Sequence, residues 1–173
     1  MNTFELKVWD DESRLCTFYT VHCEGSKLSE TDMFFERYEN DPLYEEAVQE
    51  LLSFILYSIG DDHGALDALF NRFENEVIGL PSKGRIKMGS FTYHYPNFPL
   101  RIYALKITEQ IVVLFGGGVK DGPTNQTSSL NIKWVEACQF SRKIIQSLDE
   151  GDILINNDEQ RLTNYYGEDQ III

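Results

Sequence analysis

Residues 100–115 read LRIYALKITEQIVVLF, two apolar runs on either side of a short polar break. The runs, Leu100 to Ile107 and Gln110 to Phe115, are rich in β-branched and aromatic residues, which favour strands. Only Thr108-Glu109 separates them, so the stretch predicts a β-hairpin. Because both runs are apolar over most of their length, we expect this hairpin to lie centrally in a sheet.

Periodic patterns precede the hairpin. Alternation in Phe4 to Trp9 predicts a strand, and Leu15 to Cys23 predicts a second strand that could pair with it. Between Pro42 and Ile59, apolar residues recur at spacings of three and four, which predicts an amphipathic helix packed on the sheet. The combination predicts an α+β fold, with N-terminal strands and helices packed on a small, mostly antiparallel sheet.

Shorter patterns predict the remaining elements. These are a helix from Ser29 to about Tyr38, a helical stretch from His63 through Phe70, a strand from Phe91 to Tyr95, a helix capped by Asn131 with a core face of Val135, Cys138, Ile144, Ile145 and Leu148, and an edge strand from Asp152 to Ile155. We expect one domain over residues 1–155, a polar C-terminal tail over 156–173, and an exposed, mobile loop at 121–129.

Composition limits the class of protein. The 173 residues are 42% apolar and 13% aromatic, which is enough for a packed core and excludes a disordered chain. No apolar run could span a bilayer and no signal sequence opens the chain, so we expect a cytoplasmic protein. Cys16, Cys23 and Cys138 form no CxxC pair and are interpreted as reduced thiols. A zinc site from Cys16, His22 and Cys23 is a weak alternative, because the spacing matches no zinc finger.

The net charge of −13 is unevenly distributed. Residues 1–79 carry 5 basic and 18 acidic side chains, residues 80–120 carry 6 and 1, and residues 121–173 carry 4 and 9. The acidic excess would repel nucleic acid at long range. Only the basic central segment would attract a phosphate.

Two basic residues of that segment are candidates for binding an anion. Arg101 interrupts an apolar strand and, by alternation, shares a face with Tyr103. It either pairs with an acidic residue or is aimed at an anion, and His94 in the preceding strand could lie beside it. Lys120 follows Gly116-Gly117-Gly118-Val119, which lacks the spacing of a phosphate-binding loop. We expect the glycines to end the strand and Lys120 to project from its end.

Three further basic residues, Lys83, Arg85 and Lys87, alternate before Phe91. They form either a solvated face or a patch that contacts a nucleic acid backbone. No Ser-His-Asp set and no HExxH motif accompanies them.

The stretch from His63 to Lys120 resembles the RelE/ParE toxin superfamily, in its HigB-like and phage-derived branch. The resemblance is carried by Leu100-Arg101-Ile102-Tyr103, the apolar strand Ile111 to Phe115, and Gly118-Val119-Lys120. A helix with an alanine in its first turns follows in that family, as Trp134-Val135-Glu136-Ala137 does here.

This resemblance implies a RelE/ParE-like α+β domain that is the toxin component of a type II toxin–antitoxin system. The implied activity is metal-free endoribonuclease cleavage of mRNA without a cofactor. Arg101 would stabilise the phosphate and Lys120 would be the basic residue after the hairpin. The implied partners are a cognate antitoxin and the ribosome or mRNA, with no membrane. The alternative is a non-catalytic toxin-fold interaction protein that binds a partner peptide or protein, which the acidic balance favours.

Overall fold

A computed structural model describes residues 2–120 and 130–173 of the chain. Its elements are β1 (Phe4–Asp10), β2 (Thr17–Cys23), α1 (Glu30–Glu39), α2 (Glu45–Ser53), the π-helix η1 (Phe54–His63), β3 (Phe73–Glu74), β4 (Val77–Leu80), β5 (Arg85–Met88), β6 (Phe91–His94), β7 (Leu100–Thr108), β8 (Ile111–Val119), α3 (Asn131–Glu150), β9 (Ile153–Asn156), β10 (Arg161–Asn164) and β11 (Ile171–Ile172). The predicted α+β class is confirmed.

The main sheet has seven strands among the described residues, in the order β11-β1-β2-β8-β7-β4-β3. All neighbours are antiparallel except β2 and β8, which are parallel. The predicted hairpins β1–β2 and β7–β8 are both confirmed, and β7–β8 lies near the middle of the sheet. β5–β6 and β9–β10 form two separate two-stranded sheets.

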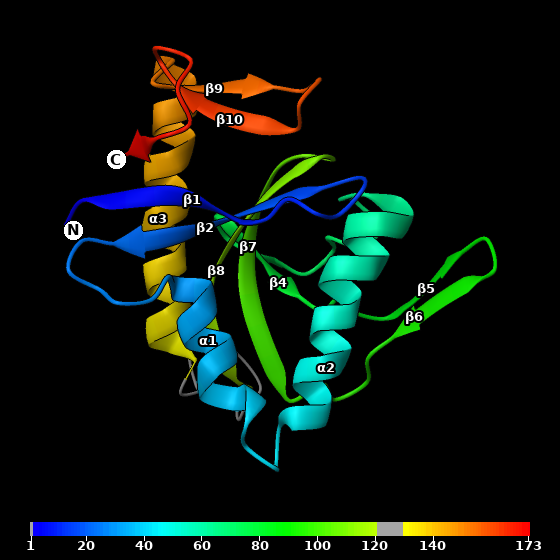
Figure 1. Ribbon diagram of the computed structural model, residues 1–173. Helices are drawn as coiled ribbons and strands as arrows, with labels where there is room; N and C mark the ends of the chain where they lie inside the picture. Colours follow the sequence, from blue (N-terminus) through cyan, green and yellow to red (C-terminus); the bar gives the residue numbers. More distant parts are fainter. Residues whose placement is uncertain (1, 121–129) are drawn as a thin grey trace.

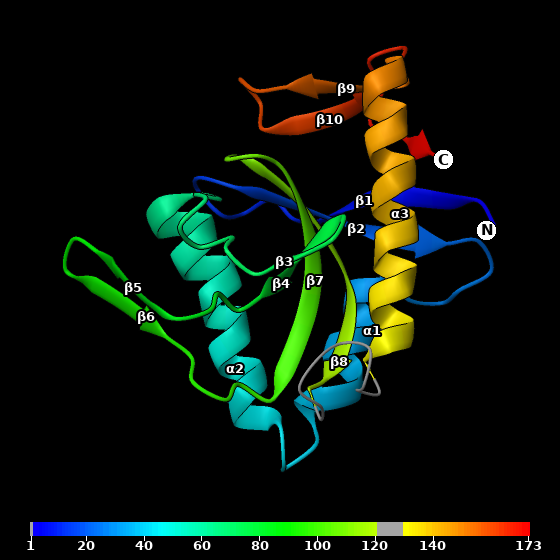
Figure 2. The same cartoon turned by 180° about the vertical axis from the view of Figure 1, so that it is seen from behind.

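Helices cover both faces of this sheet (Figures 1 and 2). Leu100, Ile102 and Ala104 of β7 pack into one core with α1, α2 and η1. Tyr103 of β7 packs into the second core, beneath α3. Side chains alternate along a strand, which explains why β7 contributes to both cores. The shared core of α2 and β7 confirms that the predicted helix packs on the β7–β8 hairpin.

The helix predicted to start at Pro42 begins at Glu45. Asp41 still directs the start, because its carboxylate accepts the Leu43 N–H at 3.0 Å and its carbonyl accepts the Tyr44 and Glu45 N–H groups. The helix does not end near Gly60 but continues as η1 to His63. It ends at Gly64, whose φ of 77° suits glycine.

Two local predictions are wrong. The stretch Leu66 to Phe70 forms turns rather than a helix, with the Leu69 and Phe70 N–H groups bonded to the Leu66 carbonyl. The glycines 116–118 do not end their strand but lie within β8. Residues without a Cβ are needed there because neighbouring groups approach the strand closely.

Leu130, and not Asn131, occupies the N-cap position of α3, and the helix ends at Gly151, which is in the left-handed conformation. Its predicted core face is confirmed at Cys138 and Ile144, which are buried, but Val135 and Ile145 are exposed. Ala137 and Phe140 fill the core in their place.

The stretch 156–173, expected as a polar tail, contributes β10 and β11. The strand predicted at Asp152 to Ile155 is β9, which pairs with β10 and not with the main sheet. β11 lies at the sheet edge beside β1. The loop 121–129 lies outside the described residues. None of the described helices is long and apolar enough to cross a membrane.

Candidate functional site

Arg101 lies at the start of β7 and is only 6% exposed. Its Nη1 donates to the Phe98 carbonyl at 3.2 Å and to the Leu100 carbonyl at 2.9 Å. Within the described residues its Nε has no hydrogen-bond partner, and no carboxylate lies within ion-pair distance of the guanidinium. A buried cation in this state is costly unless an anion joins it.

The charge of the Arg101 guanidinium is influenced by three nearby groups, Arg72, Glu74 and Tyr103. Burial, with repulsion from Arg72, lowers the pKa of Arg101 to about 10, although Glu74 and Tyr103 oppose the shift. Burial also lowers the pKa of Arg72, and burial with the nearby Glu74 raises the pKa of Tyr103. Arg101 is therefore still charged at neutral pH, and a second arginine, Arg72, lies near it.

Lys120 lies at the same end of the β7–β8 hairpin as Arg101, and this end is called the Arg101 corner below. Arg101 is paired with Gly118, and the Lys120 N–H donates to the Pro99 carbonyl at 2.7 Å, so the antiparallel ladder continues past β8. Residues 118 and 120 point to the same face, which is the face of Arg101. The two predicted site residues are thus diagonal neighbours, with Cα atoms separated by about 7–8 Å.

The first turn of α3 lies over this corner. A Cβ on Gly118 would be 3.3 Å from Leu130 Cδ1, and Trp134 Nε1 donates to the Glu74 carbonyl at 3.0 Å. No side chain caps α3, and its first turn holds no acidic residue. The partial positive charge of a helix N-terminus thus lies on the same side of the sheet as Arg101 and Lys120.

The other predicted site residues lie elsewhere. Arg85 and Lys87 are in β5 of the β5–β6 hairpin, and Lys83 lies in the segment that leads into it, where its backbone is hydrogen-bonded to the Asn71 side chain. His94, expected beside Arg101, pairs with Arg85 in that hairpin. Figures 1 and 2 show β5–β6 projecting beyond α2, on the side of the molecule away from α3. The three basic residues and His94 therefore lie apart from Arg101.

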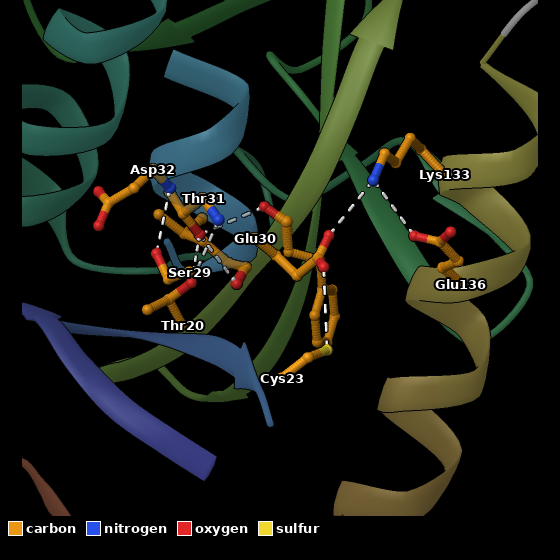
Figure 3. Close-up of polar contacts among 10 residues, drawn as sticks. Thr20, Cys23, Ser29, Glu30, Thr31, Asp32, Lys133 and Glu136 are labelled. Atoms are coloured by element: carbon orange, nitrogen blue, oxygen red, sulfur yellow. Dashed lines mark hydrogen bonds and ion pairs between the residues drawn. The ribbon is translucent and has the colours of Figure 1, made fainter. Parts of the chain in front are cut away.

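A second polar cluster, not predicted from sequence, joins α1 to α3 (Figure 3). The buried Glu30 carboxylate lies 3.5 Å from Lys133 Nζ, which is also 3.3 Å from Glu136. Cys23 Sγ donates to Glu30 at 3.9 Å. Burial raises the pKa of Glu30 despite Lys133. Burial would lower the pKa of Lys133, but attraction to Glu30 and Glu136 outweighs it and raises that pKa.

Glu30 and Lys133 of this cluster line a cavity of about 220 Å³, together with Gly116 and Gly117 of β8. A Cβ on Gly116 would lie 3.2 Å from Glu30 Oε2, so the glycine makes room for the carboxylate. Beside it, Thr20 and Thr31 hydroxyls lie 2.6 Å apart, and Thr31 Oγ1 donates to the Leu114 and Phe115 carbonyls of β8. The contacts fasten α1 to β8 and α3. The capping residue Ser29, which accepts the Asp32 N–H, was the only sequence signal for this region.

No family model, curated protein or solved structure matches the chain. Across residues 2–120 and 130–173, no group of three or more His, Cys, Asp or Glu side chains is arranged to hold a metal.

Proposed function

We propose that the chain is a RelE/ParE-like toxin of a type II toxin–antitoxin system, acting as a metal-free endoribonuclease on mRNA. The observation that carries the proposal is the position of Arg101 and Lys120 on one face at one end of the β7–β8 hairpin. The lack of a paired carboxylate on Arg101 within the described residues leaves its Nε available for a phosphate oxygen.

In this proposal, the ribose 2′-oxygen attacks the adjacent phosphorus and the bond from phosphorus to the 5′-oxygen breaks. The 2′-hydroxyl proton is lost to solvent, and the leaving 5′-oxygen takes up a proton from water. The product strand ends in a 2′,3′-cyclic phosphate. Negative charge builds up on the phosphate oxygens in the transition state, and the Arg101 guanidinium and the Lys120 ammonium stabilise it.

The proposal requires that a phosphate gain access to the buried Arg101 guanidinium. Because Arg101 is 6% exposed, a phosphate reaches its Nε only when the groups that cover it move. The half-buried Lys120 is more accessible and would meet the phosphate first. An antitoxin that holds the covering groups in place would keep the enzyme inactive, which is the partner relation that the proposal requires.

The test is expression of the chain alone, with growth and RNA cleavage as readouts, for the parent, Arg101→Met and Lys120→Ala. Either substitution should slow cleavage by about 100-fold, the usual effect of losing one preorganised transition-state partner. Lys27→Ala, which removes an exposed charge elsewhere, should cleave as the parent does. Melting temperatures of all variants separate loss of chemistry from loss of fold.

Stability adds a second readout for Arg101. Methionine is similar in volume to arginine and carries no charge, so Arg101→Met should leave the free energy of unfolding unchanged or raise it. A loss of more than about 2 kcal/mol would instead assign Arg101 a structural role. Full toxicity in both site variants would contradict the proposed roles.

A second candidate function is the non-catalytic one, in which a RelE/ParE-like fold binds a partner protein. The two bonds from Arg101 Nη1 to backbone carbonyls and the net charge of −13 favour it. A parent chain that neither arrests growth nor cleaves RNA, yet is recovered with the product of a neighbouring gene, would support this candidate.

A further inference from the structure

The β5–β6 hairpin, called the arm below, is a two-stranded sheet separate from the main one. Arg85 pairs with His94 and Met88 with Phe91, and the tip turns at Gly89, whose φ is 63°. In Figure 1 the arm extends past α2, away from the rest of the molecule. A two-stranded hairpin is marginally stable alone, so the arm needs an anchor.

The inward face of the arm supplies that anchor. Ile86, Met88 and Tyr93 pack against the core that contains α2 and η1. The Tyr93 hydroxyl lies 2.9 Å from His63 Nε2 at the end of η1, and its ring meets Phe54 edge-on at 6.0 Å. These contacts fix which face of the arm points outward.

The outward face is polar and basic. Arg85 and Lys87 alternate with the inward residues on β5 and are exposed. Directly across from them, His94 and Thr92 are exposed on β6. Lys83, also exposed, precedes the first strand.

These charges have no counterions in the described part of the chain. The sequence contains no Asp or Glu between Glu76 and Glu109. None of Lys83, Arg85 and Lys87 takes part in an ion pair among the described residues. On a molecule of net charge −13, the outward face of the arm is thus a surface with uncompensated positive charge.

We propose that the outward face of the arm binds the sugar–phosphate backbone of RNA, as a docking surface separate from the Arg101 corner. Arg85 and Lys87 contact phosphates, and Thr92 and His94 donate hydrogen bonds beside them. The proposal rests on the proposed function for the choice of RNA as the polyanion, but it does not depend on cleavage.

The composition of the face favours a nucleic acid backbone over an acidic protein. Protein interfaces have an apolar core, whereas Arg85, Lys87, Thr92 and His94 offer none. Backbone contacts to nucleic acids are made by Arg, Lys, Ser, Thr and similar donors, without an apolar centre.

The experiment measures binding of a short fluorescent 2′-O-methyl oligouridine, which cannot be cleaved, to the full chain by anisotropy. Parent, Arg85→Gln/Lys87→Gln and the control Lys7→Gln/Lys27→Gln are compared between about 50 and 200 mM salt. Both doubles remove two exposed positive charges. The arm double should bind about tenfold more weakly at the lower salt, and its slope of log K against log salt should fall by about 1.4, at about 0.7 for each phosphate contact. The control should bind as the parent does.

The proposal is overturned if the arm double binds like the parent, if the control loses as much affinity, or if the parent shows no salt-dependent binding. Preferential binding of polyglutamate over the oligouridine at the arm would also overturn it, in favour of an acidic protein partner. A parent that binds through the arm but cleaves no RNA defeats the proposed function alone. A parent that cleaves while the arm double binds normally defeats the arm alone.

Discussion

Glu30 shows how a single buried carboxyl can depend on its surroundings. It is held between the Lys133 ammonium and the Cys23 thiol, on the first turn of α1. Lys133 attracts the Glu30 carboxylate, but it also pairs with Glu136. Its attraction does not offset the cost of removing water from around the Glu30 carboxylate. The folded chain consequently holds the Glu30 proton to a higher pH than the unfolded chain does.

This shift predicts a pH-dependent contribution to stability. A carboxyl whose folded pKa is raised contributes most below its ordinary pKa of about 4.3, and the contribution is lost as pH rises through the raised value. Glu30→Gln cannot titrate, so the free energy of unfolding of the parent minus that of the variant should fall from about pH 4 to about pH 7. Urea denaturation at several pH values measures the difference.

Glu39→Gln, which removes an exposed carboxyl from the same helix, controls for the change in net charge. If the free energy of unfolding of the parent instead rises relative to that of Glu30→Gln as pH increases, the ion pair with Lys133 outweighs the cost of burying the carboxylate.

At the residue scale, alternation along β7 predicted that Arg101 shares the face of Tyr103, which agrees with the continuous strand Leu100–Thr108 and with the effect of Tyr103 on the pKa of Arg101. Its burial could not be predicted, because α3 covers that face from thirty residues or more further along the chain. Glu30 was missed for the same reason, since Lys133 comes from a distant helix. Side-chain direction is a local property, whereas enclosure depends on long-range packing.

Among the elements, β8 depends most on its glycines. A Cβ added to Gly117 would overlap the carbonyl of Arg101 on the paired strand. At Gly118 the nearest atom is instead the flexible end of the Leu130 side chain, 3.3 Å away. Two adjacent glycines of one strand thus differ in whether their neighbour can move aside.

Gly117→Ala should therefore destabilise the chain by about 3 kcal/mol or more, since the β7–β8 ladder would have to separate. Gly118→Ala should cost at most about 1 kcal/mol, because a Leu rotamer can adjust. Guanidinium denaturation of both variants against the parent gives the comparison. Equal losses at the two positions would contradict the close approach of the two strands at Gly117.

Element prediction succeeded where the signal was local. Period-two alternation identified β1, apolar β-branched runs identified β7 and β8, and the Ser29 cap identified α1. It failed for β11 because two isoleucines become a strand only by pairing with β1. It failed for residues 116–118 because glycine usually ends a strand, whereas here close packing requires it within one. The basic alternation of the arm was seen, but its separation from the main sheet was not.

At the scale of the whole molecule, the three cysteine thiols can show whether the two cores on either face of the main sheet unfold together. Cys16 lies in the core beneath α2 and Cys138 in the core beneath α3, and both are buried. Burial raises the pKa of Cys16 to about 12 and that of Cys138 to about 11. Cys23 is only partly buried, and burial with the nearby Glu30 raises its pKa as well.

Iodoacetamide at about pH 8 should accordingly modify Cys23 in the folded chain, while Cys16 and Cys138 react only after unfolding. Peptide mass spectrometry over a denaturant series would follow each thiol. If the two layers unfold together, Cys16 and Cys138 should become reactive at the same denaturant concentration. Labelling of Cys16 in native buffer as fast as Cys23 would show that its core opens locally.

The pairing of β11 with β1 joins the two ends of the described chain. The Phe4 N–H donates to the Ile173 carbonyl at 3.0 Å, and the Ile173 N–H returns a bond to Phe4 at 2.8 Å. During synthesis, β1 leaves the ribosome before all the other elements described here, yet this part of its outer edge stays unpaired until residues 171–173 have emerged. A nascent chain therefore exposes this strand edge while all the residues between β1 and β11 are being made, and chaperones that cover such edges would protect it from joining other chains.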